Sequence, residues 1–181
     1  MIITIGRECG CNADEIGRML AGKYGIFCYT KAELIQLAKE KGVYEKYPFF
    51  FGEMPVDMMI SPMAESLEER LRNTPQEALE SVLGGEDCVI VGRCANYILK
   101  DKALSLFIYA PFEARLKTVM ERTGREEKSA RKMIKKIDKD RRAYYEYFTD
   151  KKWKDISQYH LAFDSSKFEQ DKIIQMIKMA L

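Results

Sequence analysis

Histidine is nearly absent from this chain of 181 residues, since His160 is the only one. A catalytic triad with a histidine base, or a metal centre with several histidine ligands, would have to be built around this single residue. The five cysteines are an odd number for a set of disulfides, and no pair has the CxxC spacing of a zinc site. We therefore expect reduced thiols and chemistry that depends on other side chains.

Long apolar runs are also missing. No stretch of about 18 apolar residues occurs, and the first residues do not combine a charged start with a long apolar segment. We therefore expect a cytoplasmic protein that neither spans a membrane nor is secreted. The hydrophobic share of 46% is enough to bury one sizeable core. This predicts one domain over residues 1–181, with inserted subregions.

The hydrophobic pattern alternates between short apolar strands and amphipathic helices. Strands are expected at residues 2–6, 26–30, 88–92, 104–109 and 159–164, and helices at 14–24, 31–41, about 63–83, 111–122, 126–149 and 167–180. This alternation predicts an α/β fold in which helices cover both faces of a five-stranded parallel sheet, a three-layer α/β/α arrangement. The loops that follow the strands then share one edge of the sheet, so the loops after residues 6 and 92 are candidates for ligand binding.

The first of these loops has the layout of a phosphate-binding loop. An isoleucine-rich strand precedes it, Gly10 permits a tight turn, and a helix begins near Asp14. Peptide N–H groups at such a helix start attract anions, and the candidates are those of Gly10, Cys11, Asn12 and Ala13. The pattern GxxxxGK[ST] also requires a lysine and a hydroxyl residue, which this turn lacks. These residues alone suit a nucleotide loop and an ordinary strand-turn-helix unit equally well.

The second candidate follows the third strand, in the sequence CVIVGRCANYIL at residues 88–99. Arg93 lies where this buried strand ends, so its base is fixed and its planar guanidinium can match the oxygens of a phosphate. The alternative is a structural ion pair between Arg93 and a nearby carboxylate. Arg93 is the strongest single candidate for anion binding.

The third candidate is the charged helix KMIKKIDKDRRAYYEYF at residues 132–148. Asp138 and Arg142 are spaced i,i+4, so they share a helix face and can orient each other, and Arg141 is adjacent. If this helix closes over the sheet edge, its arginines could neutralise charge on a transferring phosphoryl group. An exposed helix with ordinary ion pairs is the competing interpretation.

Basic charge is concentrated in this part of the chain. Between Glu113 and Lys154 there are 15 Lys and Arg residues against 8 Asp and Glu residues, a local net charge of +7, whereas the rest of the chain carries −5. Such a patch suits a solvated helix surface, a nucleic-acid footprint or a cover over an anionic substrate. The tyrosines of the helix could stack on bases, but an apolar helix face is the favoured interpretation, and the acidic remainder argues against nucleic acid.

Almost 60 residues separate the second and third strands, far more than one crossover helix needs. The middle of this insertion, YPFFFGEMPVDMMISPM from Tyr47 to Met63, is rich in aromatic residues, methionine and proline. One interpretation is an adaptable apolar surface for a planar ligand. The favoured interpretation is a loop that packs on the core or contacts another subunit.

Two features near the end of the chain have alternative interpretations. Trp153, in a basic loop, either covers the core or contacts a ligand. Asp164, Ser165 and Ser166 end the last strand and are expected to cap the final helix, although in a nucleotide site they would lie beside a base.

In order along the chain, these motifs resemble the cytidylate kinase-like proteins, relatives of the nucleoside monophosphate kinases in the P-loop group. ITIGRECG with DEIGRMLAGKYG is similar to the opening strand, loop and helix of that family, and FCYTKAELIQLA to its second strand and following helix. The remaining family blocks are similar to VIVGRCANYIL, to the stretch from FIYAPFEARLKTVMER through DKDRRAYYEYFTDKKW, and to YHLAFDSSK. The GRCANYIL block and the DxxRRxYY helix are the most specific of these.

The resemblance implies a P-loop kinase-like fold, with an acceptor-binding insertion at about residues 31–86 and a helical lid at about 123–155. It implies transfer of the γ-phosphoryl group of ATP to a nucleoside monophosphate, with CMP as a candidate acceptor and with Mg²⁺. By position, Arg7 begins the phosphate loop and Arg93 meets the acceptor phosphate. The lid supplies Arg141 and Arg142 to stabilise the transferred charge, and Asp138 to orient an arginine.

Two positions depart from the family pattern. Cytidylate kinases carry lysine and serine where this chain has Ala13 and Asp14, and the kinase-like proteins usually carry an arginine near the position of Asp14. A carboxylate beside bound phosphates repels them unless Mg²⁺ lies between, so Asp14 either helps to hold the metal or signals lost ATP binding. The aspartate of the family's GRD motif is Cys94 here, so selectivity for cytosine is not implied.

Three hypotheses follow. The leading one is a nucleotide kinase-like enzyme whose ligands are ATP, Mg²⁺ and a nucleoside monophosphate. The second is a nucleotide-binding sensor that has lost catalysis, and the third is a nucleic-acid binder that uses the basic helix. The acceptor base, the metal ligands and the oligomeric state stay open, and a homo-oligomer is one alternative.

Overall fold

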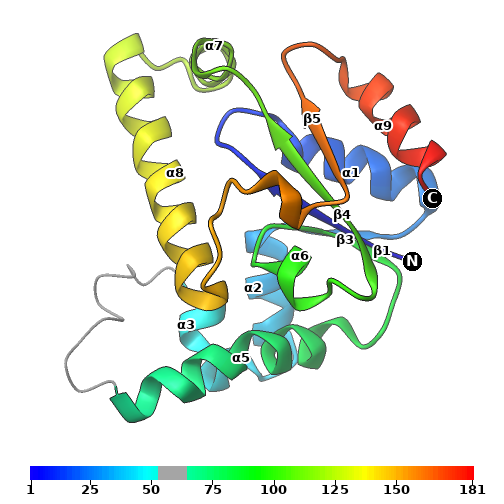
Figure 1. Cartoon of the computed structure of the whole chain (residues 1–181), viewed down its shortest axis with the longest axis vertical. Coiled ribbons are helices and arrows are strands. Elements are labelled where there is room, and N and C mark those ends of the chain that lie inside the picture. The colour runs from blue at the N-terminus through cyan, green and yellow to red at the C-terminus, as the bar shows by residue number, and fades with distance from the viewer. Residues whose placement is uncertain (53–64) are drawn as a thin grey trace.

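Five parallel strands form one sheet at the centre of the molecule (Figure 1). The computed structural model describes residues 1–52 and 65–181, and for residues 65–73 it describes the backbone alone. The strands are β1 (Ile2–Arg7), β2 (Phe27–Tyr29), β3 (Cys88–Val91), β4 (Ala103–Tyr109) and β5 (Leu161–Asp164), in the order β2-β3-β1-β4-β5. The predicted five-stranded parallel sheet is therefore confirmed.

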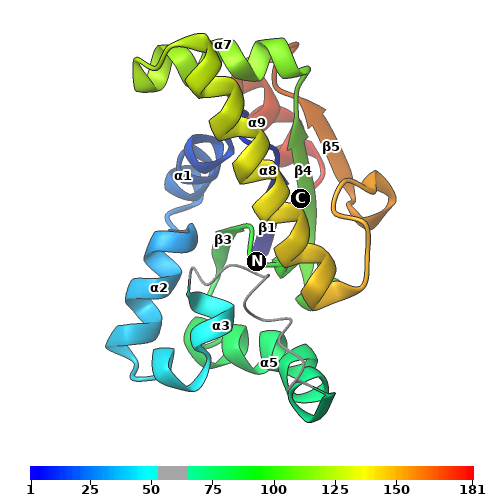
Figure 2. The ribbon, with the colours of Figure 1, turned by 90° about the vertical axis from the view of Figure 1, so that its left-hand side faces the viewer.

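Helices cover both faces of the sheet, which confirms the three-layer prediction (Figure 1, Figure 2). On one face, α1 (Ala13–Tyr24) and α9 (Gln170–Met179) pack with Val89 and Val91 of β3. The alternate side chains of β3, Cys88 and Ile90, belong to the cluster on the other face. The helices of that cluster are α2 (Lys31–Glu40), α3 (Pro48–Phe51), α5 (Glu65–Leu83), α6 (Ala95–Ile98) and α8 (Glu127–Thr149).

Helix α7 (Phe112–Thr123) packs against the first half of α8 in a third, smaller cluster. In both views α8 runs from α7 toward the end of the molecule where α3 and α5 lie (Figure 1, Figure 2). The basic helix of the sequence is therefore one long element that passes over the carboxyl edge of the sheet. Among the described residues, no helix is long and apolar enough to span a membrane.

The turn between β1 and α1 requires two residues in the left-handed region, Gly10 (φ 90°) and Asn12 (φ 52°). A Cβ atom at Gly10 would lie 2.7 Å from the backbone oxygen of Arg115 in α7. Glycine is therefore needed here for its dihedral angles and because α7 passes close by. Farther on, the same lack of a side chain at Gly17 lets α1 approach β3, since a Cβ there would lie 2.9 Å from Val91.

The aromatic stretch that follows Tyr47 packs into the core where it is described. Phe50 and Phe51 are fully buried at the end of α3, in edge-to-face contact with ring centres 5.1 Å apart. This confirms, for residues 47–52, the prediction of a segment that packs on the core. The rest of the stretch, residues 53–63, lies outside the described residues.

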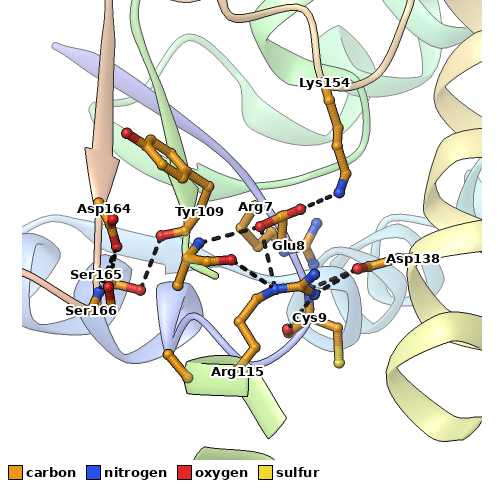
Figure 3. Close-up of polar contacts among 12 residues, drawn as sticks. Arg7, Glu8, Cys9, Tyr109, Arg115, Asp138, Lys154, Asp164, Ser165 and Ser166 are labelled. Atoms are coloured by element: carbon orange, nitrogen blue, oxygen red, sulfur yellow. Dashed lines mark hydrogen bonds and ion pairs between the residues drawn. The ribbon is translucent and has the colours of Figure 1, made fainter. Parts of the chain in front are cut away.

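Several short elements were not predicted, namely α3, α6 and the 3₁₀ turns at Tyr44–Lys46 and Ile156–Gln158, because each is too short to show a helical period. The prediction that Asp164, Ser165 and Ser166 cap the final helix is wrong. Helix α9 begins only at Gln170, and the Asp164 carboxylate instead accepts the N–H of Ser166 at 2.9 Å in a local turn (Figure 3).

Candidate functional site

A cavity of about 420 Å³ lies at the carboxyl ends of β1 and β3. The two strands are neighbours, but α1 follows β1 on one face of the sheet and α6 follows β3 on the other. This divergence creates the crevice in which open α/β sheets bind ligands. Gly6 and Arg7 line the cavity from β1, and Gly92 and Arg93 line it from the loop after β3. Both loops chosen from the sequence therefore reach it.

The lining of the cavity is strongly basic. Among the described residues of the lining, one side chain is a carboxylate, that of Asp140, and six are cationic, those of Arg7, Lys31, Arg93, Lys136, Lys139 and Arg141. Asp140 is already paired with Lys136, with 2.7 Å between Oδ2 and Nζ. The excess of positive charge suits an anionic ligand.

Arg93 forms one wall of the cavity and is only 8% exposed. Its Nη1 donates to the carbonyl oxygen of Phe50 at 2.6 Å, and its Nη2 donates to that of Phe51 at 2.9 Å. The guanidinium carbon lies 5.1 Å from the centre of the Tyr144 ring. Arg93 thus holds the end of α3 against β3. Its partners are carbonyl oxygens, where the sequence suggested a phosphate or a carboxylate.

Arg7, the last residue of β1, brings a second guanidinium to the cavity. Its Nε lies 3.8 Å from Oδ1 of Asp14, an ion pair that is too long for a hydrogen bond. Burial lowers the pKa of Arg7 to about 9, the positive charges of Arg141 and Arg93 act in the same direction, and Asp14 opposes them. The Nη1 of Arg141 lies above this strand end, 3.4 Å from the backbone oxygen of Arg7.

Aromatic side chains form the remaining wall, and they belong to Tyr144, Tyr145, Trp153 and Tyr159. The Tyr144 hydroxyl donates to the oxygen of Phe50 at 2.8 Å, and the amide of Asn96 donates to the Tyr145 hydroxyl at 3.0 Å. Burial raises the pKa of all three tyrosines, which are therefore neutral. The prediction of an apolar helix face is confirmed, since Tyr144 and Tyr145 pack against the core. Trp153 both covers the core and lines the cavity.

A separate group of charges lies under the loop after β1, centred on Arg115 of α7 (Figure 3). Arg115 Nη1 donates to Oδ2 of Asp138 at 2.7 Å and to the oxygen of Cys9 at 3.1 Å. Its Nε donates to the oxygen of Ala110 at 3.1 Å and lies 3.3 Å from Oε2 of Glu8. The second oxygen of Asp138, Oδ1, accepts the N–H of Cys9 at 2.8 Å.

Lys154 completes this group by pairing with Glu8 (Figure 3). Two carboxylates, those of Glu8 and Asp138, are thus matched by two cations, Arg115 and Lys154. All but Lys154 are largely buried. We call these four residues the loop network. It fixes the loop after β1 to α7, to α8 and to the segment before β5.

The loop itself keeps unpaired N–H groups. None of the backbone N–H groups of residues 10–14 donates to an acceptor within the described residues, while those of Glu15 and Ile16 bond to the oxygen of Asn12. Gly10, Cys11, Asn12 and Ala13 do not line the cavity. Arg7, which precedes this loop and forms a long ion pair with Asp14, does line the cavity.

Residues 2–167 match the cytidylate kinase-like family. The chain belongs to this family. Curated cytidylate kinases from Methanococcoides burtonii and Pyrococcus furiosus are 26% and 28% identical to it, and the alignments include all of this chain and 97% and 88% of those proteins. The resemblance seen in the sequence is thereby confirmed.

Solved structures agree with this assignment. An uncharacterised protein from Eubacterium ventriosum is 31% identical, with a TM-score of 0.73 over 99% of this chain and 97% of that one. Shikimate kinase from Aquifex aeolicus is 17% identical, with a TM-score of 0.52 over 99% of this chain and 95% of that one. The second likeness shows the fold alone, which is that of the P-loop kinases.

Two residues predicted for the site of this cytidylate kinase-like protein lie elsewhere than expected. Asp138 does not orient Arg142, because its carboxylate is engaged by Arg115 of α7 and by the loop. The Arg142 side chain is exposed and does not line the cavity. The i,i+4 spacing predicted Arg142 as the partner of Asp138. The buried Arg115 of α7 takes that place, because it competes with the exposed Arg142.

The residues that the sequence did not single out are Glu8, Arg115 and Lys154. A signal existed for Arg115, which interrupts the apolar face that Leu116 and Val119 give to α7. A cation on an apolar helix face is rarely buried without carboxylate partners. Nothing in the sequence identified those partners, because Glu8 and Asp138 come from distant parts of the chain.

Within the described residues, no group of three or more His, Cys, Asp and Glu side chains could hold a metal ion by itself. Mg²⁺ commonly binds through one or two carboxylates together with phosphate oxygens and water. Asp14, the predicted ligand, has a side chain that is 49% exposed beside the loop. It fits the role of a single protein carboxylate toward a magnesium-nucleotide complex, and this role stays a prediction.

Proposed function

We propose that the protein transfers the γ-phosphoryl group of ATP to a nucleoside monophosphate bound in the basic cavity, with CMP as the first acceptor to test. The observation that carries this proposal is the cavity itself, which combines arginine side chains with aromatic walls at the carboxyl ends of β1 and β3. Arginine suits the phosphate of such a ligand, and the aromatic walls suit its base. The names of the curated relatives support the same reaction class.

In this proposal the cavity positions the acceptor. Arg141 contacts the transferring phosphoryl group, and Arg93 adds its charge while it holds Phe50 and Phe51 in place. Arg142 stays the weaker prediction for stabilising that charge. Asp138 positions the loop after β1 through its bond to Cys9. Catalysis then consists of alignment and charge neutralisation, with no covalent intermediate.

The donor phosphates would lie at the unpaired N–H groups of Gly10, Cys11, Asn12 and Ala13, which open α1. Asp14 would hold Mg²⁺, which would supply charge neutralisation at these phosphates. The metal is needed there in particular, because the loop carries a carboxylate and no lysine.

A second candidate function is nucleotide binding without catalysis. The observation that favours it is the Asp138 carboxylate, which accepts the N–H of Cys9 at 2.8 Å and so places an internal anion on the loop. Together with the missing lysine, this internal anion weakens the case for ATP binding at the loop.

A coupled assay across the common nucleoside monophosphates, with ATP and Mg²⁺, tests the enzyme. We expect turnover with at least one acceptor. Absence of turnover with every acceptor, by protein whose folding is checked by circular dichroism, rejects the kinase. Isothermal titration calorimetry then decides the second candidate, which requires tight nucleotide binding without turnover.

A further inference from the structure

The Nε atom of Arg7 is fully buried and has no hydrogen-bond partner among the described residues. An arginine side chain carries five N–H donors, and buried polar groups of this kind are nearly always satisfied. The nearest carboxylate, that of Asp14, lies 3.8 Å from Nε. Within the described residues, only this long ion pair offsets the charge of Arg7, so the cation is available to an anionic ligand in the cavity.

The backbone opposite Arg7 is shaped to admit the guanidinium. Gly92 lies at φ 88°, and a Cβ atom there would lie 2.2 Å from Nη1 of Arg7 and 3.0 Å from its Cζ. Only a residue without a side chain leaves this space free. Arg7 is therefore held at the junction of β1 and β3, on the side that faces the cavity.

The surroundings of Arg7 disfavour its own charge. Arg141 and Arg93 act on Arg7 in the same direction as burial, and the Asp14 carboxylate offsets them only in part. A ligand with two negative charges would relieve this repulsion, and a phosphate monoester also offers oxygens that match a planar guanidinium.

We propose that Arg7 is a direct ligand of a phosphate monoester dianion bound in the cavity between Arg7 and Arg141. This rests on the proposed function, since the dianion would be the phosphate of the acceptor.

If Arg7 serves to bind a ligand, the ligand-free protein should not need Arg7 for its stability. Replacing Arg7 by methionine removes a buried charge and breaks no hydrogen bond within the described residues, so the melting temperature without ligand should stay the same or rise. A purely structural arginine would lower the melting temperature when replaced. In Arg7→Met, the melting temperature without ligand should therefore stay the same or rise, while the affinity for the ligand falls.

The experiment compares wild type, Arg7→Met, Arg7→Lys and the control Arg125→Met, an exposed arginine outside the cavity. Binding of inorganic phosphate and of CMP is measured by calorimetry and by the rise in melting temperature, at constant ionic strength. We expect affinity for both probes to fall roughly 10- to 100-fold in Arg7→Met. Arg7→Lys should recover part of it, because the charge returns without the planar fork, and Arg125→Met should match wild type.

Several outcomes would overturn the assignment of Arg7. They are unchanged affinity in Arg7→Met, a lower melting temperature of ligand-free Arg7→Met, and a wild type that binds neither phosphate nor CMP. Binding that depends on Arg7, by a protein that turns over no nucleoside monophosphate, supports the assignment and rejects the kinase. Turnover of a nucleoside monophosphate by Arg7→Met with an unchanged KM supports the kinase and rejects the assignment of Arg7.

Discussion

The loop network and the cavity lie side by side at the same edge of the sheet, but their charges are balanced differently. In the loop network, Glu8 and Asp138 are matched by Arg115 and Lys154. In the cavity, the part of the lining that the structure describes has six cationic side chains and one carboxylate, which is already paired. Buried charges that satisfy each other stabilise a backbone conformation, whereas an unbalanced set is available to a ligand. The balance of charge therefore distinguishes the residues that fix the loop from the residues that are available to bind a ligand.

The largest effect on this comparison is expected from Arg115→Ala. Arg115 is 6% exposed, and its loss leaves the buried Asp138 carboxylate without its cationic partner and Glu8 with Lys154 alone. We expect the free energy of unfolding to fall by about 3–5 kcal/mol, measured by urea denaturation. Lys117→Ala is the matched control, since this side chain of the same helix is 79% exposed, and it should change stability by at most about 0.5 kcal/mol. A loss below about 1 kcal/mol for Arg115→Ala would show that the loop does not depend on the network.

Arg141→Ala tests the cavity by removing one of its cationic side chains. Arg141 lines the cavity, and its contact with the oxygen of Arg7 is long, at 3.4 Å. We expect kcat/KM for the preferred acceptor to fall roughly 10²- to 10³-fold, with the free energy of unfolding within about 0.5 kcal/mol of wild type. Lys135→Ala, an exposed residue of α8 outside the cavity, controls for charge alone. A stability loss in Arg141→Ala without a change in kcat/KM would place Arg141 with the structural charges.

Alanine substitutions at Gly10 and at Gly92 compare the loop after β1 with the cavity. Both positions have positive φ, so alanine strains the backbone by about 1–3 kcal/mol at each. At Gly10 the new Cβ also meets the backbone of Arg115, whereas at Gly92 it meets the movable end of the Arg7 side chain. Gly10→Ala should therefore lose more stability in urea denaturation, and Gly92→Ala should lose more affinity for inorganic phosphate. The opposite ranking in either measurement contradicts this prediction.

The smallest effect is expected from Tyr144→Phe. The Tyr144 hydroxyl donates to the Phe50 oxygen at 2.8 Å, but that oxygen also accepts a bond from Arg93. We expect a loss of about 1 kcal/mol in the free energy of unfolding. Tyr97→Phe, at a tyrosine that is 39% exposed, is the control and should be neutral. A neutral Tyr144→Phe would mean that Arg93 alone holds the end of α3.

The elements of the fold could be predicted from the sequence because each has a clear period of its own. The apolar run of β1 and the amphipathic pattern of α8 needed no tertiary information. The cavity edge could also be predicted, since parallel strands with alternating helices place their loops together. The short helices were missed and the first turn of α9 was placed too early, because the period is weak there and helix ends fray.

The partners within the site could not be predicted in this way. Arg93 bonds to carbonyl oxygens about 40 residues earlier in the chain, in a stretch without a period. Asp138 bonds to Arg115, 23 residues away, and not to the arginine one turn farther along its helix. Both outcomes depend on which distant groups are buried together, and spacing along one helix says nothing about that.

Helix α8 is secured at three places along its 23 residues. Ala130 and Ile134 pack on α7, Asp138 bonds to the first loop, and Tyr145 and Phe148 pack against the sheet. A helix that is held at both ends and near its middle resists rotation as a rigid body. Adaptation to an incoming nucleotide would then fall on the rotamers of side chains such as Arg141, and most of the electrostatic field would be preorganised before the ligand arrives.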